Sequence, residues 1–181
     1  MTGAMLMTYS GTCDSPLGTL RLIAQNNSLT GLIIDGDPSS ARTGPLDEDQ
    51  PVFAAVRAWL AAYFDKKNPS AADLPLAPAG TPFQQEVWAM LCKIPYGTTR
   101  TYGELAQEIA VRRNIPRMAS QAVGGAVGRN PIGIIIPCHR VVGANGNLTG
   151  YGGGLHHKVS LLALEGVDMS GFYMPRHASD T

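Results

Sequence analysis

The chain lacks the features that mark disulfide-rich, membrane and zinc-binding proteins. Its 181 residues include only three cysteines, at positions 13, 92 and 138, and no CxxC pair. An odd, widely spaced set argues against a disulfide framework and against a four-cysteine zinc module. No apolar run approaches the roughly 18 residues of a membrane-spanning helix, and residues 1–6 do not resemble a signal peptide. We therefore expect a reduced, cytoplasmic, globular protein without membrane contact or a metal site.

The chain also lacks net charge, which by itself argues against a nucleic-acid partner. Its basic and acidic residues are unevenly distributed, however, with a net charge of −3 over residues 1–96 and +3 over residues 97–181. Between Arg100 and Arg140, six arginines stand against two glutamates. A phosphate-binding face is expected in that stretch. The alternative is an ordinary solvated helical surface.

The first part of the chain is typical of a small α/β scaffold domain, which we place at residues 1–75. Residues 19–24 and 29–34 are rich in β-forming side chains. Asn26 and Asn27 stand between them and favour a tight hairpin turn.

A loop, a helix and a linker follow these two strands. Residues 35–51 are rich in Pro, Ser, Gly and Asp, which predicts a loop. Apolar residues then recur at helical spacing over residues 53–66, which predicts a helix. Three prolines in residues 68–80 indicate a linker between two domains.

Residues 80–170 are predicted to form a second, mostly helical domain. Thr81 with Gln84, and Thr101 with Glu104, each fit a capping box, the side-chain pattern that marks the start of a helix. The first helix is expected to extend to about residue 94 and the second to about residue 111.

A third helix is expected over residues 117–127, which are rich in Ala, Ser and Gly. Small side chains let a helix approach closely whatever it packs against. With the helix over residues 101–111 it predicts a helix-turn-helix whose second member contacts DNA. The alternative is that the two helices simply pack together.

Residues 130–154, NPIGIIIPCHRVVGANGNLTGYGGG, are the most informative stretch. The apolar run 132–136 predicts a buried strand that Pro137 ends, because proline cannot extend a strand ladder. Cys138 would then lie at the end of a strand and face a cleft. Neighbours in an extended strand point to opposite faces, so a partnership between Cys138 and His139 requires a turn.

A cysteine nucleophile acts as a thiolate, and His139 is the candidate base that would produce it. Asn145 and Gly146 favour a turn that folds Tyr151 and the glycines at 152–154 back toward the cysteine. The alternative is that Cys138 is a small buried residue and that the Cys-His pair is structural.

Together these patterns predict an α+β fold. It comprises a small N-terminal β-sheet and helix domain, then a mostly helical C-terminal domain with a helix-turn-helix and a short strand leading into the active-site turn. Residues 171–181 are expected to form a tail.

The motif PCHRVVG at residues 137–143 resembles the active-site signature of the O6-alkylguanine-DNA alkyltransferase family, also called methylated-DNA-protein-cysteine methyltransferases. Four flanking segments resemble the family in the same order, and the likeness is firm over residues 81–167. These segments are TPFQQEVW (81–88), IPYGTTRTYGELA (94–106), QAVGGAVGRNP (121–131) and LTGYGGGL (148–155).

The resemblance implies roles for residues around the signature. Cys138 would accept the alkyl group, His139 would take its proton through a bridging water, and Glu165 would orient and balance the histidine. Asn130 resembles the hinge asparagine between the recognition helix and the active-site turn. Tyr102 resembles the tyrosine that turns out the nucleotide and contacts the guanine.

The resemblance also implies how guanine and DNA are bound. The carbonyl groups of Cys138 and Val141 would accept hydrogen bonds from the guanine amino group. The substrate pocket would further include Tyr151, Gly152, Gly153 and Lys158, with the lysine near O6, while Arg140 would be structural. The implied DNA contacts are Thr101, Tyr102, Arg117, Gln121, Ala122, Gly125 and Arg129.

One position departs from the family pattern. Many members carry an arginine that fills the gap left by the flipped base, and Gln121 stands there in this chain. Glutamine can wedge and hydrogen-bond but supplies no charge, so weaker DNA binding is expected unless Arg117 or Arg129 compensates.

The function that the resemblance implies is direct DNA repair. A flipped-out O6-alkylguanine, and also O4-alkylthymine, would transfer its alkyl group irreversibly to Cys138, once per protein. The expected partner is double-stranded DNA containing alkylated guanine, bound by a monomer. Two alternatives remain open: a cysteine hydrolase, which would turn over repeatedly, and a non-catalytic binder of damaged DNA, whose known examples lack the acceptor cysteine.

Overall fold

In the computed structural model, which describes residues 7–34, 44–149, 151 and 154–174, the chain divides into two compact units. The first comprises Met1–Ala79 together with Pro131–Gly133, and the second comprises Gly80–Asn130 and Ile134–Thr181. Among the described residues, no helix is long and apolar enough to cross a membrane.

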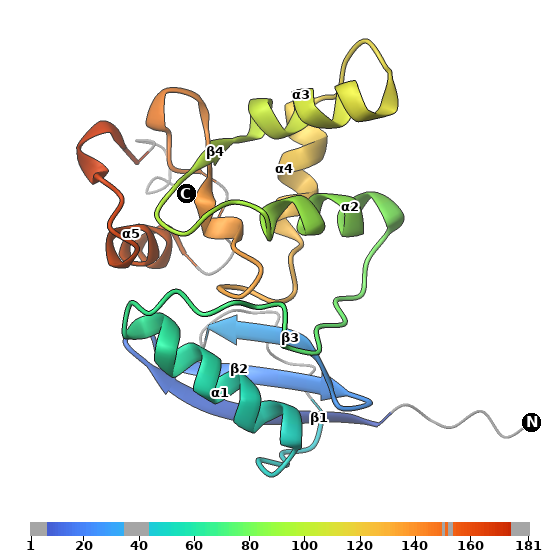
Figure 1. The fold of residues 1–181 in the computed structure, drawn as a ribbon, viewed down its shortest axis with the longest axis vertical. Helices are drawn as coiled ribbons and strands as arrows, with labels where there is room; N and C mark the ends of the chain where they lie inside the picture. Colours follow the sequence, from blue (N-terminus) through green and yellow to red (C-terminus); the bar gives the residue numbers. More distant parts are fainter. Residues whose placement is uncertain (1–6, 35–43, 150, 152–153, 175–181) are drawn as a thin grey trace, which may run out of the picture. The chain divides into compact units, whose positions relative to one another are not determined.

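The first unit is built on an antiparallel sheet of strands β1 (Thr8–Ser15), β2 (Gly18–Gln25) and β3 (Ser28–Ile34), in that order (Figure 1). Both expected strands are present. The turn between them has positive φ angles at Asn26 (48°) and Asn27 (57°), as a tight hairpin requires. The sequence analysis missed β1, whose TYSGTCDS run has few apolar residues.

Helix α1 (Pro51–Phe64) packs on this sheet and buries its apolar stripe (Figure 1). Phe53 and Val56 of the helix are fully buried, as are Leu20 and Leu22, which alternate along β2 and so point to the same face. The helix begins and ends two residues earlier than predicted. Residues 35–43 of the expected loop lie outside the described residues.

The second unit contains α2 (Pro82–Leu91), α3 (Tyr102–Arg113) and α4 (Ser120–Gly128). Both predicted capping boxes are present, at the starts of α2 and α3. Helix α3 ends at Arg113, two residues later than predicted, and is followed by Asn114 in a left-handed conformation. Helix α4 starts three residues later than predicted. Helix α4 packs against α2 and α3, and the indole Nε1 of Trp88 donates to the Ala126 carbonyl at 2.8 Å.

The predicted strand over residues 132–136 is wrong. These isoleucines are buried but lie in turns, and Ile134 has a φ of 68°. Ile132 instead forms an isolated bridge with Leu32 of β3, and the Leu32 amide donates to the Pro131 carbonyl at 2.9 Å. The apolar run correctly indicated that these residues are buried, but residues in a strand and residues in a buried turn are both apolar, so the run could not distinguish the two.

The short strand of this unit lies after the active-site turn. It is β5 (Val141–Val142), which pairs in parallel with β4 (Arg100–Thr101). The predicted α+β class is confirmed, but no strand leads into the turn.

The C-terminal segment folds back on the second unit after helix α5 (Leu155–Leu164). Met169 and Phe172 pack against a cluster of Val142, Leu148 and Leu162, and the Leu148 amide donates to the carbonyl of Tyr173 at 2.9 Å. The predicted tail begins at residue 171, but Phe172 packs on this cluster and the Tyr173 backbone hydrogen-bonds to the unit, while the Tyr173 and Met174 side chains are exposed. Residues 175–181 lie outside the described residues.

We expect Thr81→Ala to lower the free energy of unfolding by about 1 kcal/mol, the usual cost of losing an N-cap side chain. The Thr81 hydroxyl accepts from the Gln84 amide at 3.1 Å, and the Gln84 side chain accepts from the Thr81 amide at 3.0 Å. Urea denaturation measures the change. Thr81→Ser keeps the accepting oxygen and is the control; a serine variant as unstable as the alanine variant would contradict the capping role.

Candidate active site

Cys138 lies at the start of a short 3-10 helix, Cys138–Arg140, that directly follows Pro137. The Arg140 amide donates to the Pro137 carbonyl at 3.0 Å, and the Val141 amide donates to the Cys138 carbonyl. This is the turn that a Cys-His partnership was expected to need. The cysteine is buried, with 9% of its surface exposed.

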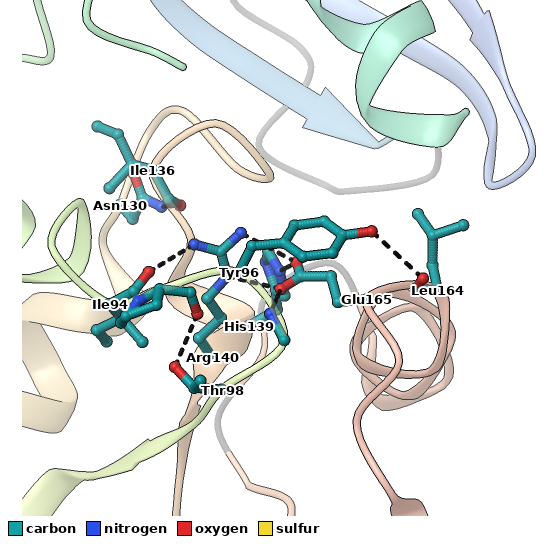
Figure 2. Close-up of polar contacts among 11 residues, drawn as sticks. Ile94, Tyr96, Thr98, Asn130, Ile136, His139, Arg140, Leu164 and Glu165 are labelled. Atoms are coloured by element: carbon teal, nitrogen blue, oxygen red, sulfur yellow. Dashed lines mark hydrogen bonds and ion pairs between the residues drawn. The ribbon is translucent and has the colours of Figure 1, made fainter. Parts of the chain in front are cut away.

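Asn130 ties the end of α4 to this turn. Its Nδ2 donates to the Ile136 carbonyl at 2.8 Å (Figure 2), and its side chain also hydrogen-bonds to the Cys138 sulfur, which favours the thiolate. Asn130 thus links the two segments between which the sequence resemblance implied a hinge asparagine.

His139 and Glu165 form a fully buried pair. Both side chains have no exposed surface, and Nε2 of the imidazole lies 2.5 Å from Oε2 of the carboxylate (Figure 2). Glu165 follows the last residue of α5 and precedes Gly166, whose φ is 83°, so the predicted position at the helix end is confirmed. With Nε2 facing Glu165, Nδ1 is the ring nitrogen available for chemistry at the thiol.

The Glu165 carboxylate also binds two groups that the sequence analysis did not assign to it. Its Oε1 accepts from the Gly97 amide at 3.0 Å and from Arg140 Nε at 2.8 Å, and Oε2 accepts from Arg140 Nη2 at 3.3 Å (Figure 2). The contact with Gly97 could not be predicted, because it uses a backbone amide and needs no particular side chain. The contact with Arg140 could be suspected only because this arginine lies in the PCHR motif.

The pKa of the Cys138 thiol reflects opposing effects. Burial raises it most, because burial disfavours the charged thiolate. The Asn130 side chain, the charge of Lys158 and the backbone amides of Cys138 and His139 lower it. Positive charge and hydrogen-bond donors therefore gather around the sulfur in a site that water barely reaches.

Burial also dominates at His139 and lowers the pKa of its imidazole, while contact with Glu165 raises it. A lowered pKa keeps the ring neutral near neutral pH, and a neutral ring is what a general base must be. The pair therefore has the protonation state needed to take a proton from the thiol.

Lys158 is fully buried on α5 and binds two backbone carbonyls of the same unit. Its Nζ donates to the Val141 carbonyl at 2.6 Å and to the Thr149 carbonyl at 2.9 Å. The Tyr102 hydroxyl donates to the same Thr149 carbonyl at 3.0 Å. Burial lowers the pKa of Lys158 to about 8 and raises that of Tyr102 to about 12, and each of the two also interacts with Cys138.

These contacts bring together, near Cys138, three of the residues for which the sequence predicted contact with the guanine: Tyr102, Val141 and Lys158. Thr149 was not predicted, because it participates through its backbone. Tyr151 also belongs here: burial raises the pKa of its phenol, and so does Cys138. Gly152 and Gly153 lie outside the described residues.

The residues expected to contact DNA come from the start of α3 and from α4 and the chain at its two ends. Thr101 and Tyr102 at the start of α3 are half-buried. Arg117, just before α4, is exposed, and so are the α4 and post-α4 residues Gln121, Ala122, Gly125 and Arg129.

Most arginines between residues 100 and 140 already pair with glutamates of this chain, so fewer remain to bind phosphate than the composition suggested. Arg100 and Arg112 both pair with Glu108, and Arg113 pairs with Glu86. Arg140 is engaged by Glu165. Within the described residues no ion pair involves Arg117 or Arg129, so these two remain as phosphate-binding candidates.

Family models match both units. A model of the DNA-binding domain of 6-O-methylguanine DNA methyltransferase matches residues 82–167, and one of that protein's ribonuclease-like domain matches residues 8–78. The methylated-DNA-protein-cysteine methyltransferase of Mycolicibacterium paratuberculosis is 46% identical over 155 residues, covering 85% of this chain and 90% of the relative. That of Methanosarcina mazei is 47% identical over 159 residues, covering 87% and 96%.

The solved structures that resemble this chain belong to the same family as its sequence relatives. The crystal structure of Mycobacterium tuberculosis OGT in complex with DNA is 43% identical, covers 91% of this chain and 94% of its own, and superposes with a TM-score of 0.75. That of the O6-methylguanine methyltransferase of the same organism has a TM-score of 0.74 at 43% identity, with 92% and 96% covered. The chain therefore belongs to the 6-O-methylguanine DNA methyltransferase family.

Proposed function

We propose that the chain repairs DNA directly, by one irreversible transfer of an alkyl group from O6 of guanine to the sulfur of Cys138. The observation that carries the proposal is the grouping of Cys138, His139 and Glu165 in one buried turn, in a chain of this family. The same chemistry extends the proposal to O4 of alkylated thymine.

Recognition would begin with extrusion of the damaged base. The O6 atom lies inside the base stack, so the nucleotide has to rotate out, at a cost that is lowest for a poorly paired, alkylated base. The exposed surface that contains Gln121, Ala122 and Gly125 supports contact with the duplex, with Gln121 filling the gap left by the base. Arg117 and Arg129 would bind phosphates.

The chemistry would follow from the charges around the sulfur. His139 accepts the thiol proton, a sulfur–carbon bond forms as the carbon–O6 bond breaks, and the departing guanine regains one proton. The Tyr102 hydroxyl, with a pKa of about 12, stays protonated, and its proton would turn from the Thr149 carbonyl to the guanine ring when the base is bound. No cofactor enters this scheme.

Single turnover would follow from the product. A thioether has no carbonyl carbon for water to attack, unlike the acyl-enzyme of a cysteine hydrolase. Cys138 is then not regenerated. A DNA substrate supports a cytoplasmic location. One chain supplies Cys138, His139, Glu165 and Tyr102, which supports a monomer.

Intact mass spectrometry after incubation with a duplex that carries one O6-methylguanine tests this function. We expect a gain of one methyl group, at most one per protein, and none for Cys138→Ala. The control Cys92→Ala removes an exposed cysteine and is expected to gain the methyl group normally. Binding of the duplex without a gain of mass would instead indicate a damage-recognition protein.

We expect Gln121→Arg to tighten binding of duplex DNA severalfold, because arginine adds a positive charge to a surface close to phosphates. Titrations at one fixed salt concentration measure the change. Gln107→Arg adds the same charge to an exposed position on α3 and is the control. Unchanged binding by Gln121→Arg, or equal tightening by both variants, would argue against Gln121 as the gap-filling residue.

We expect Lys158→Met to slow methyl transfer about tenfold at neutral pH, since loss of a nearby positive charge raises a thiol pKa by about one unit or more. The lysine is charged below its pKa of about 8, so the deficit should shrink at higher pH. Rates measured from pH 6 to 9, beside the exposed-lysine control Lys67→Met, test this. A uniform deficit at every pH would contradict the electrostatic role.

A further inference from the structure

Arg140 is held more firmly than a solvent-exposed arginine would be. Its guanidinium donates twice to Glu165 and, through Nη1, to the Ile94 carbonyl at 2.7 Å (Figure 2). It also lies over the ring of Tyr96, 5.7 Å from the centroid, and only 11% of its side chain is exposed.

The carboxylate that Arg140 binds is the one that His139 faces. Glu165 has a single negative charge, and it is shared between the guanidinium and the imidazole across a distance of a few ångströms. Arginine keeps its charge at any pH that the fold survives. The negative charge that an imidazolium would need as its partner is therefore already neutralised.

The charged and titratable groups around the imidazole favour its neutral form. The ring has one carboxylate near it, Glu165, and two positive charges, Arg140 and Lys158, of which the lysine is charged below its pKa of about 8. The thiol belongs to the neighbouring residue of the chain. Burial lowers the pKa of His139 most, contact with Glu165 raises it, and the charges of Arg140 and Lys158 lower it further. The groups concerned are Glu165 and Lys158 from α5, Arg140 and Cys138 from the active-site turn, and Tyr96 from the turn after α2.

We propose that Arg140 is a positioning residue that sets the charge of the site: it neutralises Glu165, so that His139 stays uncharged and able to accept the thiol proton. The bidentate contact also fixes the carboxylate, and through it the ring. This inference rests on the proposed function only for its effect on the reaction rate.

The test compares Arg140→Gln and Arg140→Lys with the unaltered protein. Imidazole ¹⁵N NMR gives the pKa of His139, assigned by its loss in His139→Gln. Single-turnover methyl transfer from a duplex containing O6-methylguanine is measured from pH 5.5 to 8.5. The fall of the rate at low pH is the acidic limb of this pH–rate profile. NMR uses no DNA, so it remains informative if no transfer occurs, an outcome that would refute the proposed function instead.

In the unaltered protein the pKa of His139 is expected below its ordinary 6.5. Arg140→Gln should raise it by about one unit or more, the usual effect of one nearby charge. A protonated imidazole accepts no proton, so the acidic limb moves to higher pH by the same amount. At pH 6 the rate falls roughly tenfold, while at pH 8 it is within about threefold of normal. Arg140→Lys keeps the charge and should leave the limb nearly in place while lowering Tm.

Arg57→Gln is the matched control. Arg57, in the first unit, also pairs with a glutamate, binds backbone carbonyls and lies over an aromatic ring, 5.8 Å from the Phe53 centroid. Arg57→Gln should lower Tm without moving the acidic limb of the pH–rate profile.

A purely structural Arg140 predicts a different pattern. Arg140→Gln would then lower Tm, or the rate at every pH, and would leave the pKa of His139 unchanged; that result overturns the proposal. If Arg140→Gln does not fold, a His139 pKa above 6.5 in the unaltered protein would still overturn the proposal, because it would show that Glu165 is not neutralised.

Discussion

The second unit depends on one buried carboxylate. Glu165 accepts hydrogen bonds from the turn after α2, through Gly97, and from the active-site turn, through His139 and Arg140. An ionised carboxylate is costly to bury unless its oxygens are satisfied and its charge is balanced, and both conditions are met here. Loss of Arg140 would leave the charge of the carboxylate unbalanced, and loss of the Gly97 or His139 donor would leave a buried oxygen with one hydrogen bond fewer.

The same principle organises the sulfur side of the site. Burial opposes the thiolate, and the charge of Lys158, the Asn130 amide and two backbone donors favour it. Lys158 is itself kept in place by the Val141 and Thr149 carbonyls. The positive charges of Lys158 and Arg140 thus balance the negative charges of the thiolate and Glu165. The imidazole of His139 is neutral, so it can accept the thiol proton.

Local signals were read correctly from the sequence, and long-range ones were not. The capping boxes at Thr81 and Thr101 and the turn at Asn26 depend on neighbours a few residues apart, so their patterns are visible in the chain. The run 132–136 was misread because an apolar run records burial, and only tertiary contacts decide between a strand and a turn. Gly97 and Thr149 were missed because they act through backbone atoms.

Helix α4 connects the surface proposed to bind DNA with the site of chemistry. Its inner side is fixed by Trp88 at Ala126, and a side-chain carbon added at Gly124 would lie 3.7 Å from the Tyr102 ring. Its end is tied to the active-site turn by Asn130. Helix α4 therefore has an inner side in ordinary packing contact with its neighbours and an open outer side at Gly125. Because one short helix carries both, a duplex seated on its outer face would be placed in a fixed relation to Cys138, and the position of the flipped base would be set by the packing of α4 rather than by flexible side chains.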